Sequence, residues 1–344
     1  MKKPSFLKAG AIACLLASAI PAMAQEVTLR MHQFLPPQAT VPAQVLIPWA
    51  EAVGEASDGR IKVEVYSAMA LGGTPPQLMD QVADGVVDIA WTLPGYTPGR
   101  FPRVEVFELP FMMNDAEATS RAYWNMYESD MADADFADFH MLGAWVHGPG
   151  VIHVKGDAVE SIDDMDGLKV RGPTRVINGL LGELGATPIG MPVPALPENL
   201  AKGVIDGTVI PWEVTTALKI AELTDSHTEF AGDHALYTAA FVLIMNKDAY
   251  NAMPADLQAI LDSLSGAEFS ANAGKVMQAA DAVGRAAAVE NGNTIVTIEG
   301  DNLATWEASA QPVVDRWLEE MTEQGIDGQD LLTRARALIA ANGM

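Results

Sequence analysis

The hydrophobic positions of this chain change period repeatedly, which predicts strands and helices in turn. Segments 27–31, 61–65 and 86–91 alternate between apolar and polar residues or are largely apolar, as strands are. Between them, Thr40 and Thr74 precede stretches with apolar residues at helical spacing, as N-terminal caps do. This βαβαβ order predicts a parallel sheet covered by helices on both faces.

The second half of the chain repeats this plan. Strands are predicted at 168–171, 187–191 and 207–212, with amphipathic helices between them. Farther on, segment 255–291 predicts one or two long helices, and segment 304–324 predicts a further amphipathic helix. A chain of 344 residues exceeds what a single hydrophobic core usually holds, so two domains are expected.

A short internal sequence similarity suggests that the two halves of the chain are alike. Segments 77–91 and 199–212 each consist of an amphipathic helix, a glycine stop and a strand that ends in a tryptophan. Ligands of open α/β sheets bind at the carboxyl ends of the strands. If the halves face each other, Trp91 and Trp212 meet at one cleft. The alternative is that both tryptophans are core residues.

Arg171 is the most informative single residue. It ends a predicted strand, and Gly172 and Pro173 lead into a helix whose first turn we expect to hold the proline. A helix N-terminus attracts negative charge, and the guanidinium fork matches the two oxygens of a carboxylate. The alternative is a surface arginine paired with an acid such as Asp166.

The first 24 residues have the pattern of a secretory signal peptide. Three lysines precede an apolar run at 9–20 that is too short to span a bilayer. Residues 22–24 form a small-x-small cleavage site, so we expect the mature chain to begin at Gln25. The only cysteine, Cys14, lies inside this segment. The expected mature protein therefore has no disulfide and no thiol chemistry.

The net charge of the whole chain is −24. The signal segment holds three of the 21 basic residues and none of the 45 acidic ones, which leaves the mature part at net −27. Such a charge excludes nucleic acid as a partner and repels anions at long range. A site for an anionic ligand must therefore act locally, through an enclosed cation.

The order of several motifs resembles the extracytoplasmic substrate-binding proteins of TRAP transporters, the DctP family, over nearly the whole mature chain. The motifs with the closest resemblance are 161–171 (SIDDMDGLKVR), 184–188 (LGATP) and 203–207 (GVIDG). The resemblance implies an α/β, periplasmic-binding-protein-like fold: two α/β lobes with a ligand cleft between them and a long helix spanning both. That helix is expected within 255–291, and the chain is expected to cross between lobes near 145–154 and 236–245.

The resemblance also sets the expected domain boundaries. The signal peptide occupies residues 1–24. Lobe I is expected at 25–148 plus about 237–276. Lobe II is expected at 149–236 plus about 277–344, with the C-terminal helices. In the family, the arginine that matches Arg171 holds the ligand carboxylate, and the family's ligands are small organic acids.

Departures from the family pattern narrow the expected ligand. Sialic-acid-binding members carry a second arginine near the position of Val151 or Ile152, and an asparagine where this chain has Ile210. Keto-acid-binding members carry a Glu-Trp pair and a metal ion where Val209 and Ile210 stand here. We therefore expect a monocarboxylate with an apolar or aromatic body, without metal or cofactor. The predicted ligand-binding residues are Arg171, Trp91, Trp212, Ile210, His32, Phe34, Tyr237 and Glu213.

The resemblance predicts a periplasmic solute receptor that delivers its acid to the large and small membrane subunits of a TRAP permease. We expect a monomer with no stable membrane insertion and no enzymatic activity, since motifs of serine hydrolases, zinc proteases and phosphate loops are absent from the sequence. Two alternatives stay open: a ligand-sensing periplasmic protein that docks on a receptor, and a periplasmic enzyme.

Overall fold

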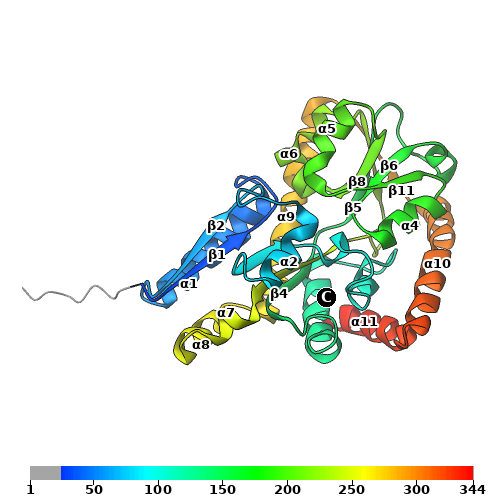
Figure 1. The fold of residues 1–344 in the computed structure, drawn as a ribbon. Helices are drawn as coiled ribbons and strands as arrows, with labels where there is room; N and C mark the ends of the chain where they lie inside the picture. The colour runs from blue at the N-terminus through cyan, green and yellow to red at the C-terminus, as the bar shows by residue number, and fades with distance from the viewer. Residues whose placement is uncertain (1–24, 344) are drawn as a thin grey trace, which may run out of the picture.

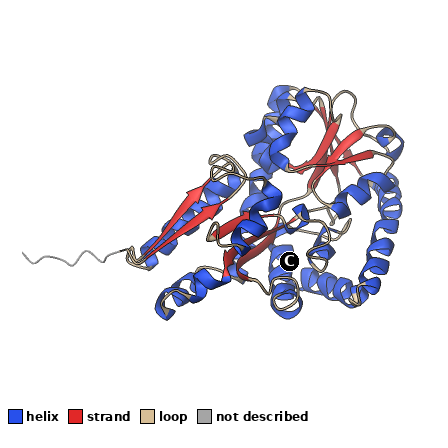
Figure 2. Cartoon of the chain, viewed as in Figure 1, coloured by secondary structure: helices blue, strands red, loops and turns tan. Residues whose placement is uncertain are grey.

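The computed structural model describes residues 25–343, which fold around two mixed β-sheets with helices packed on both (Figure 1, Figure 2). The expected signal peptide, with Cys14, lies outside the described residues. The first sheet has the strand order β2-β1-β3-β10-β4, and the second has the order β11-β9-β5-β8-β6-β7. The expected two-lobed α/β architecture is confirmed.

The first sheet is parallel at one side and antiparallel at the other. β1 pairs in parallel with β2 and β3, whereas β10 lies antiparallel between β3 and β4. The parallel pairing expected for segments 27–31, 61–65 and 86–91 is confirmed. The antiparallel part is added by β10, which returns from the second sheet and inserts between β3 and β4. The strands of the first sheet are β1 Val27–His32, β2 Ile61–Tyr66, β3 Ile89–Thr92, β4 Phe139–Val146 and β10 Ala240–Asn246.

The second sheet is built in the same way. β6 pairs in parallel with β7 and β8, and β5 lies antiparallel between β8 and β9. β5 is again the strand that arrives from the other sheet. The strands of the second sheet are β5 Gly150–Val154, β6 Lys169–Gly172, β7 Thr187–Gly190, β8 Gly207–Pro211, β9 Ser226–Phe230 and β11 Thr294–Ile298.

The chain crosses between the sheets at β4 to β5 and at β9 to β10, where expected. The crossing segments are hydrogen-bonded to each other, since Gly150 N–H donates to the Tyr237 carbonyl at 3.0 Å. Gly150 is required here: a β-carbon would lie 2.0 Å from the Tyr237 ring.

Helix α9, Ala267–Asn291, spans both halves of the fold, as expected for the long helix. It packs on α3 and β4 beside the first sheet and on the 3₁₀ turn Trp212–Val214 and α6 beside the second. Gly284 allows the second contact, because a β-carbon there would lie 2.0 Å from the Trp212 carbonyl oxygen. Helices up to α9 are α1 Ile47–Ala56, α2 Leu78–Ala83, α3 Ala116–Met126, α4 Arg175–Glu183, α5 Leu196–Ala201, α6 Thr215–Leu218, α7 Lys247–Asn251 and α8 Ala255–Ser263.

The two C-terminal helices connect the halves on the other side of the molecule (Figure 1). α10, Gly300–Glu323, packs on α4, and α11, Gly328–Asn342, packs on α3 beside the first sheet. The C-terminal helices therefore contact both halves, and the expected lobe boundaries stay a prediction. None of the helices within 25–343 is long and apolar enough to cross a membrane.

Helix α4 follows the predicted pattern with one shift. Its apolar face, Val176, Ile177, Leu180 and Leu181, is buried as the spacing predicts. The helix begins at Arg175, with Thr174 as the N-cap, so Pro173 precedes the cap and does not lie in the first turn.

Candidate functional site

A cavity lies between the two sheets. Residues from both halves of the fold line it. Those of the first half and the crossings are Phe34, Leu35, Trp91, Leu93, Tyr96, His147, Tyr237, Ala239 and Phe241; those of the second are Arg171, Pro173, Val193, Val209, Ile210, Pro211, Glu213 and Val214.

Arg171 enters this cavity from the end of β6 with its side chain buried. Its Nε donates to the Met191 carbonyl at 2.8 Å, and its Nη1 donates to the Val209 carbonyl at 3.3 Å. These two bonds hold the guanidinium plane at the cavity wall. Nη2 is buried and has no hydrogen-bond partner within residues 25–343.

The charge of Arg171 has no acidic partner in the described part of the chain. Burial lowers the pKa of its guanidinium, and the groups that act in the opposite direction are the hydroxyls of Tyr96 and Tyr237, not carboxylates. An enclosed charge without a counter-ion is costly. An anion in the cavity would neutralise this charge and fill the open position at Nη2.

Two tyrosines stand beside the arginine. The Tyr96 hydroxyl accepts a hydrogen bond from Val193 N–H at 3.1 Å, so its own proton is free to be donated. The buried Tyr237 hydroxyl has no partner among residues 25–343, and burial raises its pKa. Both hydroxyls are therefore available as neutral donors next to Arg171.

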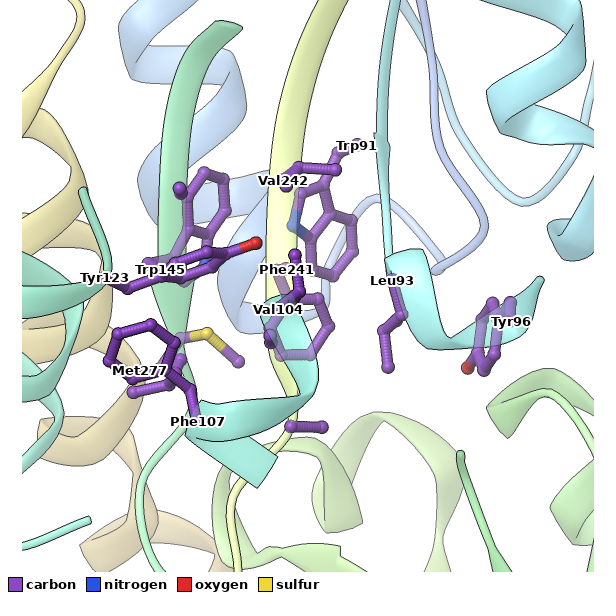
Figure 3. Packing of buried hydrophobic residues seen from close by; sticks show 14 of the residues in the cluster. Trp91, Leu93, Tyr96, Val104, Phe107, Tyr123, Trp145, Phe241, Val242 and Met277 are labelled. Atoms are coloured by element: carbon purple, nitrogen blue, oxygen red, sulfur yellow. The ribbon is translucent and has the colours of Figure 1, made fainter. Parts of the chain in front are cut away.

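Stacked aromatic rings form the apolar wall. The Trp91 ring stacks on Phe34 with centroids 4.6 Å apart and on Phe241 with centroids 5.2 Å apart. Figure 3 shows Trp91, Phe241 and Trp145 on neighbouring strands of the first sheet, with Leu93 and Tyr96 following from the end of β3. A flat apolar body fits against such a wall.

Glu213 is the single carboxyl group among the described residues that line the cavity. It follows β8 in the 3₁₀ turn, and its backbone N–H donates to Asp281 Oδ1 of α9 at 2.9 Å. Burial, reinforced by the Asp281 carboxylate, raises the pKa of Glu213 to about 8; the neighbouring Thr40 hydroxyl acts in the opposite direction. The carboxyl is therefore mainly protonated at neutral pH.

His147 lines the cavity, but both of its ring nitrogens are engaged by backbone. Ala239 N–H donates to Nε2 at 3.0 Å, so Nδ1 carries the proton that is donated to the Gly148 carbonyl. Burial lowers the pKa of His147 to about 4, so the ring is neutral at pH 7. Its role in the geometry is to join the two crossing segments.

A second arginine, Arg175, lies outside the lining of the cavity and links separate elements of the fold. Arg175, the first residue of α4, forms ion pairs with Glu105 of the first half and with Glu320 of α10. Burial alone would lower the pKa of Arg175, but the hydrogen bonds from both glutamates outweigh it and raise the pKa. Arg175 therefore links three elements across the fold.

Six of the eight predicted site residues come together around the cavity, and His32 and Trp212 do not line it. His32, the last residue of β1, is buried; Leu71 N–H donates to its Nε2, and its Nδ1 bonds Gln81 Oε1 at 2.7 Å. Because both nitrogens are used in this way, the structure gives His32 a packing role. The six lining residues are Arg171, Trp91, Ile210, Phe34, Tyr237 and Glu213.

Trp212 turns away from the cavity. The strand ends at Pro211, and the 3₁₀ turn places the indole against His153 and His227 of the second sheet. Its Nε1 donates to Glu229 Oε1 at 2.7 Å. Of the two tryptophans in the internally similar segments 77–91 and 199–212, only Trp91 therefore lines the cavity.

Several lining residues were not among the predicted ligand contacts, notably His147, Val209 and Phe241. Val209 contributes through its carbonyl, which no side-chain pattern can reveal. Phe241 sits near the start of β10, at the expected crossing, and that position was a usable signal. Within residues 25–343, no three His, Cys, Asp or Glu side chains form a metal-binding group.

Comparisons with known proteins agree with this geometry. Residues 32–321 match the family model described as bacterial extracellular solute-binding protein, family 7 (DctP). A TRAP solute-binding protein from Rhodoferax ferrireducens, solved with copurified benzoate, is 52% identical, with a TM-score of 0.90; the alignment covers 92% of this chain and 98% of that one.

Two further solved structures have related ligands. A marine metagenome TRAP solute-binding protein specific for aromatic acids, solved with 3-hydroxybenzoate, is 44% identical with a TM-score of 0.91, covering 93% of this chain and 100% of that one. A TRAP periplasmic solute-binding protein of Bordetella bronchiseptica with bound mandelate is 30% identical with a TM-score of 0.84, covering 91% and 99%.

Proposed function

The chain belongs to family 7 of the bacterial extracellular solute-binding proteins, the DctP family, and we propose that it is the receptor for an aromatic monocarboxylate. It is a TRAP solute receptor and not an enzyme, since the family and the structural neighbours are substrate-binding proteins. In the proposed complex the carboxylate lies on Arg171 and the ring lies against Trp91 and Phe34.

The observation that carries the proposal is the unpaired Nη2 of a buried arginine. Arg171 is 1% exposed and has no acidic partner among residues 25–343. A carboxylate at Nη2, with hydrogen bonds from the Tyr96 and Tyr237 hydroxyls, would neutralise the enclosed charge. The cavity holds no second arginine or lysine among its described lining residues, which favours one carboxylate over two.

The aromatic body of the ligand is inferred from the opposite wall. Phe34, Trp91 and Phe241 present stacked rings, and Leu93 and Ile210 add apolar surface. Benzoate, 3-hydroxybenzoate and mandelate in the three similar structures support this assignment. All three are aromatic rings with a single carboxylate.

Delivery to a membrane permease completes the proposal. Family membership supports an ion-driven TRAP permease as the partner and the periplasm as the place of binding. Closure of the two halves over the acid would exclude water and would strengthen the arginine–carboxylate pair. Uptake of labelled benzoate by vesicles holding the cognate membrane subunits should require the purified receptor.

A thermal-shift series tests the ligand class. The protein from Gln25 to Met344 is melted with benzoate, mandelate, succinate and benzamide, the uncharged counterpart of benzoate. A ligand that binds only the folded protein raises the melting temperature by mass action. We expect stabilisation by benzoate and mandelate but not by benzamide or succinate. Equal stabilisation by benzamide would rule out the carboxylate anchor, and stabilisation by succinate alone would rule out the aromatic ligand.

A further inference from the structure

The cavity offers a second polar position besides Arg171. Glu213 Oε2 is buried, and within residues 25–343 it has no hydrogen-bond partner. Glu213 is 3% exposed and lines the cavity. A buried oxygen left unpaired is costly, which makes a hydrogen bond from a ligand favourable.

Apart from the Trp91 indole, the other polar side chains of the wall already have hydrogen-bond partners or lie at the carboxylate end of the cavity. His147 uses both ring nitrogens on backbone. The hydroxyls of Tyr96 and Tyr237 act on the Arg171 guanidinium and so lie at its end of the cavity. Glu213 is therefore the described acidic group that is free to meet another part of the ligand.

The charge state of Glu213 decides what it can bind. The Asp281 carboxyl of α9, which accepts from the Glu213 backbone N–H, helps to raise the pKa of the Glu213 carboxyl, and burial raises its own pKa to about 7. Glu213 also shares the cavity with Arg171. With a carboxylate ligand on Arg171, a second negative charge in the same enclosed space would be unpaired. A neutral carboxyl offers one O–H donor and one acceptor oxygen, and it carries no charge to balance.

We propose that Glu213 selects, among aromatic monocarboxylates, those that carry a hydroxyl group on the ring. This inference rests on the proposed function, since it takes the carboxylate to be held by Arg171. A phenolic hydroxyl can donate to or accept from Glu213 Oε2, the carboxyl oxygen that has no partner within residues 25–343. An unsubstituted ring leaves Glu213 Oε2 unpaired, and a site with an unpaired buried polar group discriminates against such a ligand.

Trp91 is the rival for this role. Its indole Nε1 is also buried without a partner in the described structure. The ring, however, is held in a stack between Phe34 and Phe241, and Nε1 is a donor only. The experiment therefore includes a Trp91→Phe variant.

The test is calorimetric titration at pH 6.5 with benzoate and with 2-, 3- and 4-hydroxybenzoate. The quantity compared is the ratio of the benzoate Kd to the Kd of the best hydroxy isomer. We expect the natural protein to bind one isomer about tenfold more tightly than benzoate. Glu213→Met should bring the ratio to about one, and Glu213→Gln, whose amide still donates and accepts, should keep most of it. Glu198→Gln, an exposed carboxyl of α5, serves as the matched control and should keep the natural ratio.

Three results would overturn the inference. The first is equal affinity of the natural protein for benzoate and all three isomers. The second is a preference retained by Glu213→Met, or by Glu213→Ala if the first variant fails to fold. The third is loss of the preference in Trp91→Phe while Glu213→Met retains it. In each of these cases benzoate still binds and the aromatic-acid receptor stands. Failure of the natural protein to bind any of the four acids would overturn the proposed function itself.

Discussion

Arg171 and Arg175 stand four residues apart at one strand–helix junction, yet their surroundings are opposite. Arg175 is held by Glu105 and Glu320, while Arg171 is more deeply buried and has no acidic partner among residues 25–343. The paired arginine has a raised pKa and the unpaired one a lowered pKa. The paired charge of Arg175 stabilises contacts within the fold, whereas the unpaired charge of Arg171 is available to a ligand.

The largest expected effect comes from removing the unpaired arginine. Arg171→Ala should weaken benzoate binding by about 2–5 kcal/mol, roughly 30-fold to several thousandfold, because the ligand charge would be enclosed without a partner. Calorimetry on the natural protein and the variant measures this directly. Benzamide serves as the control ligand. An unchanged benzoate affinity would remove Arg171 from the binding site.

The comparison extends to two glutamates, Glu105 and Glu108, of the 3₁₀ helix Val104–Glu108. Glu105 pairs with Arg175, whereas Glu108 accepts a hydrogen bond from Ala240 N–H at 3.1 Å and has no arginine partner among residues 25–343. Burial raises the pKa of Glu108 to about 8. The folded protein keeps this proton above pH 4.5 and the unfolded chain releases it. The free energy of unfolding therefore falls as pH rises from 4.5 to about 8, by up to about 1.4 kcal/mol per pH unit.

Glu108→Gln should remove this part of the pH dependence. The stability of the variant relative to the natural protein should rise between pH 4.5 and 8 and should be constant above that, because Gln carries no proton to lose. Denaturant unfolding at half-unit pH intervals measures the difference. Two parallel stability curves over this range would show that the natural carboxyl is already ionised in the fold.

Removing the paired arginine should affect stability more than binding. Arg175→Met leaves the nearly buried Glu105 unpaired, so we expect a loss of about 1–2 kcal/mol in the free energy of unfolding, discounted because Arg175 is 29% exposed. Benzoate affinity should fall less than tenfold, through a weaker link between the halves. A loss of affinity as large as that of Arg171→Ala would contradict the contrast between the two arginines.

The smallest expected effect concerns Tyr237, whose hydroxyl lies beside the Arg171 guanidinium. Gly150→Ala would force the Tyr237 ring to move, since a β-carbon there would lie 2.0 Å from it. We expect benzoate binding to weaken by about 1 kcal/mol, the contribution of one hydrogen bond. Tyr237→Phe is the matched variant, because it removes the hydroxyl without moving the ring. If Tyr237→Phe binds benzoate as the natural protein does, its hydroxyl does not reach the ligand.

The sequence predicted most of the architecture because local rules agree with the fold. The spacing of Val176, Ile177 and Leu180 predicts the buried face of α4, and the position of Arg171 at a strand end predicts its place in the cavity. The antiparallel strands β5 and β10 were not predicted as such, because pairing direction depends on where the crossings lead and not on periodicity.

The side-chain direction at strand ends was harder to predict. Trp91 and Trp212 follow similar local sequences, but Trp91 lies within the strand region and Trp212 begins a 3₁₀ turn that rotates its ring onto the histidine pair. His32 was predicted as a contact because it follows the predicted strand 27–31, and its partners Gln81 and Leu71 come from distant segments that the sequence alone could not bring together.

A crystal structure of the protein with bound benzoate tests the central claim most directly. The account predicts the carboxylate within hydrogen-bond distance of Arg171 Nη2, with the ring against Trp91 and no ligand contact to Arg175. A carboxylate held away from Arg171, or a benzoate seated outside the cavity between the two sheets, would contradict it.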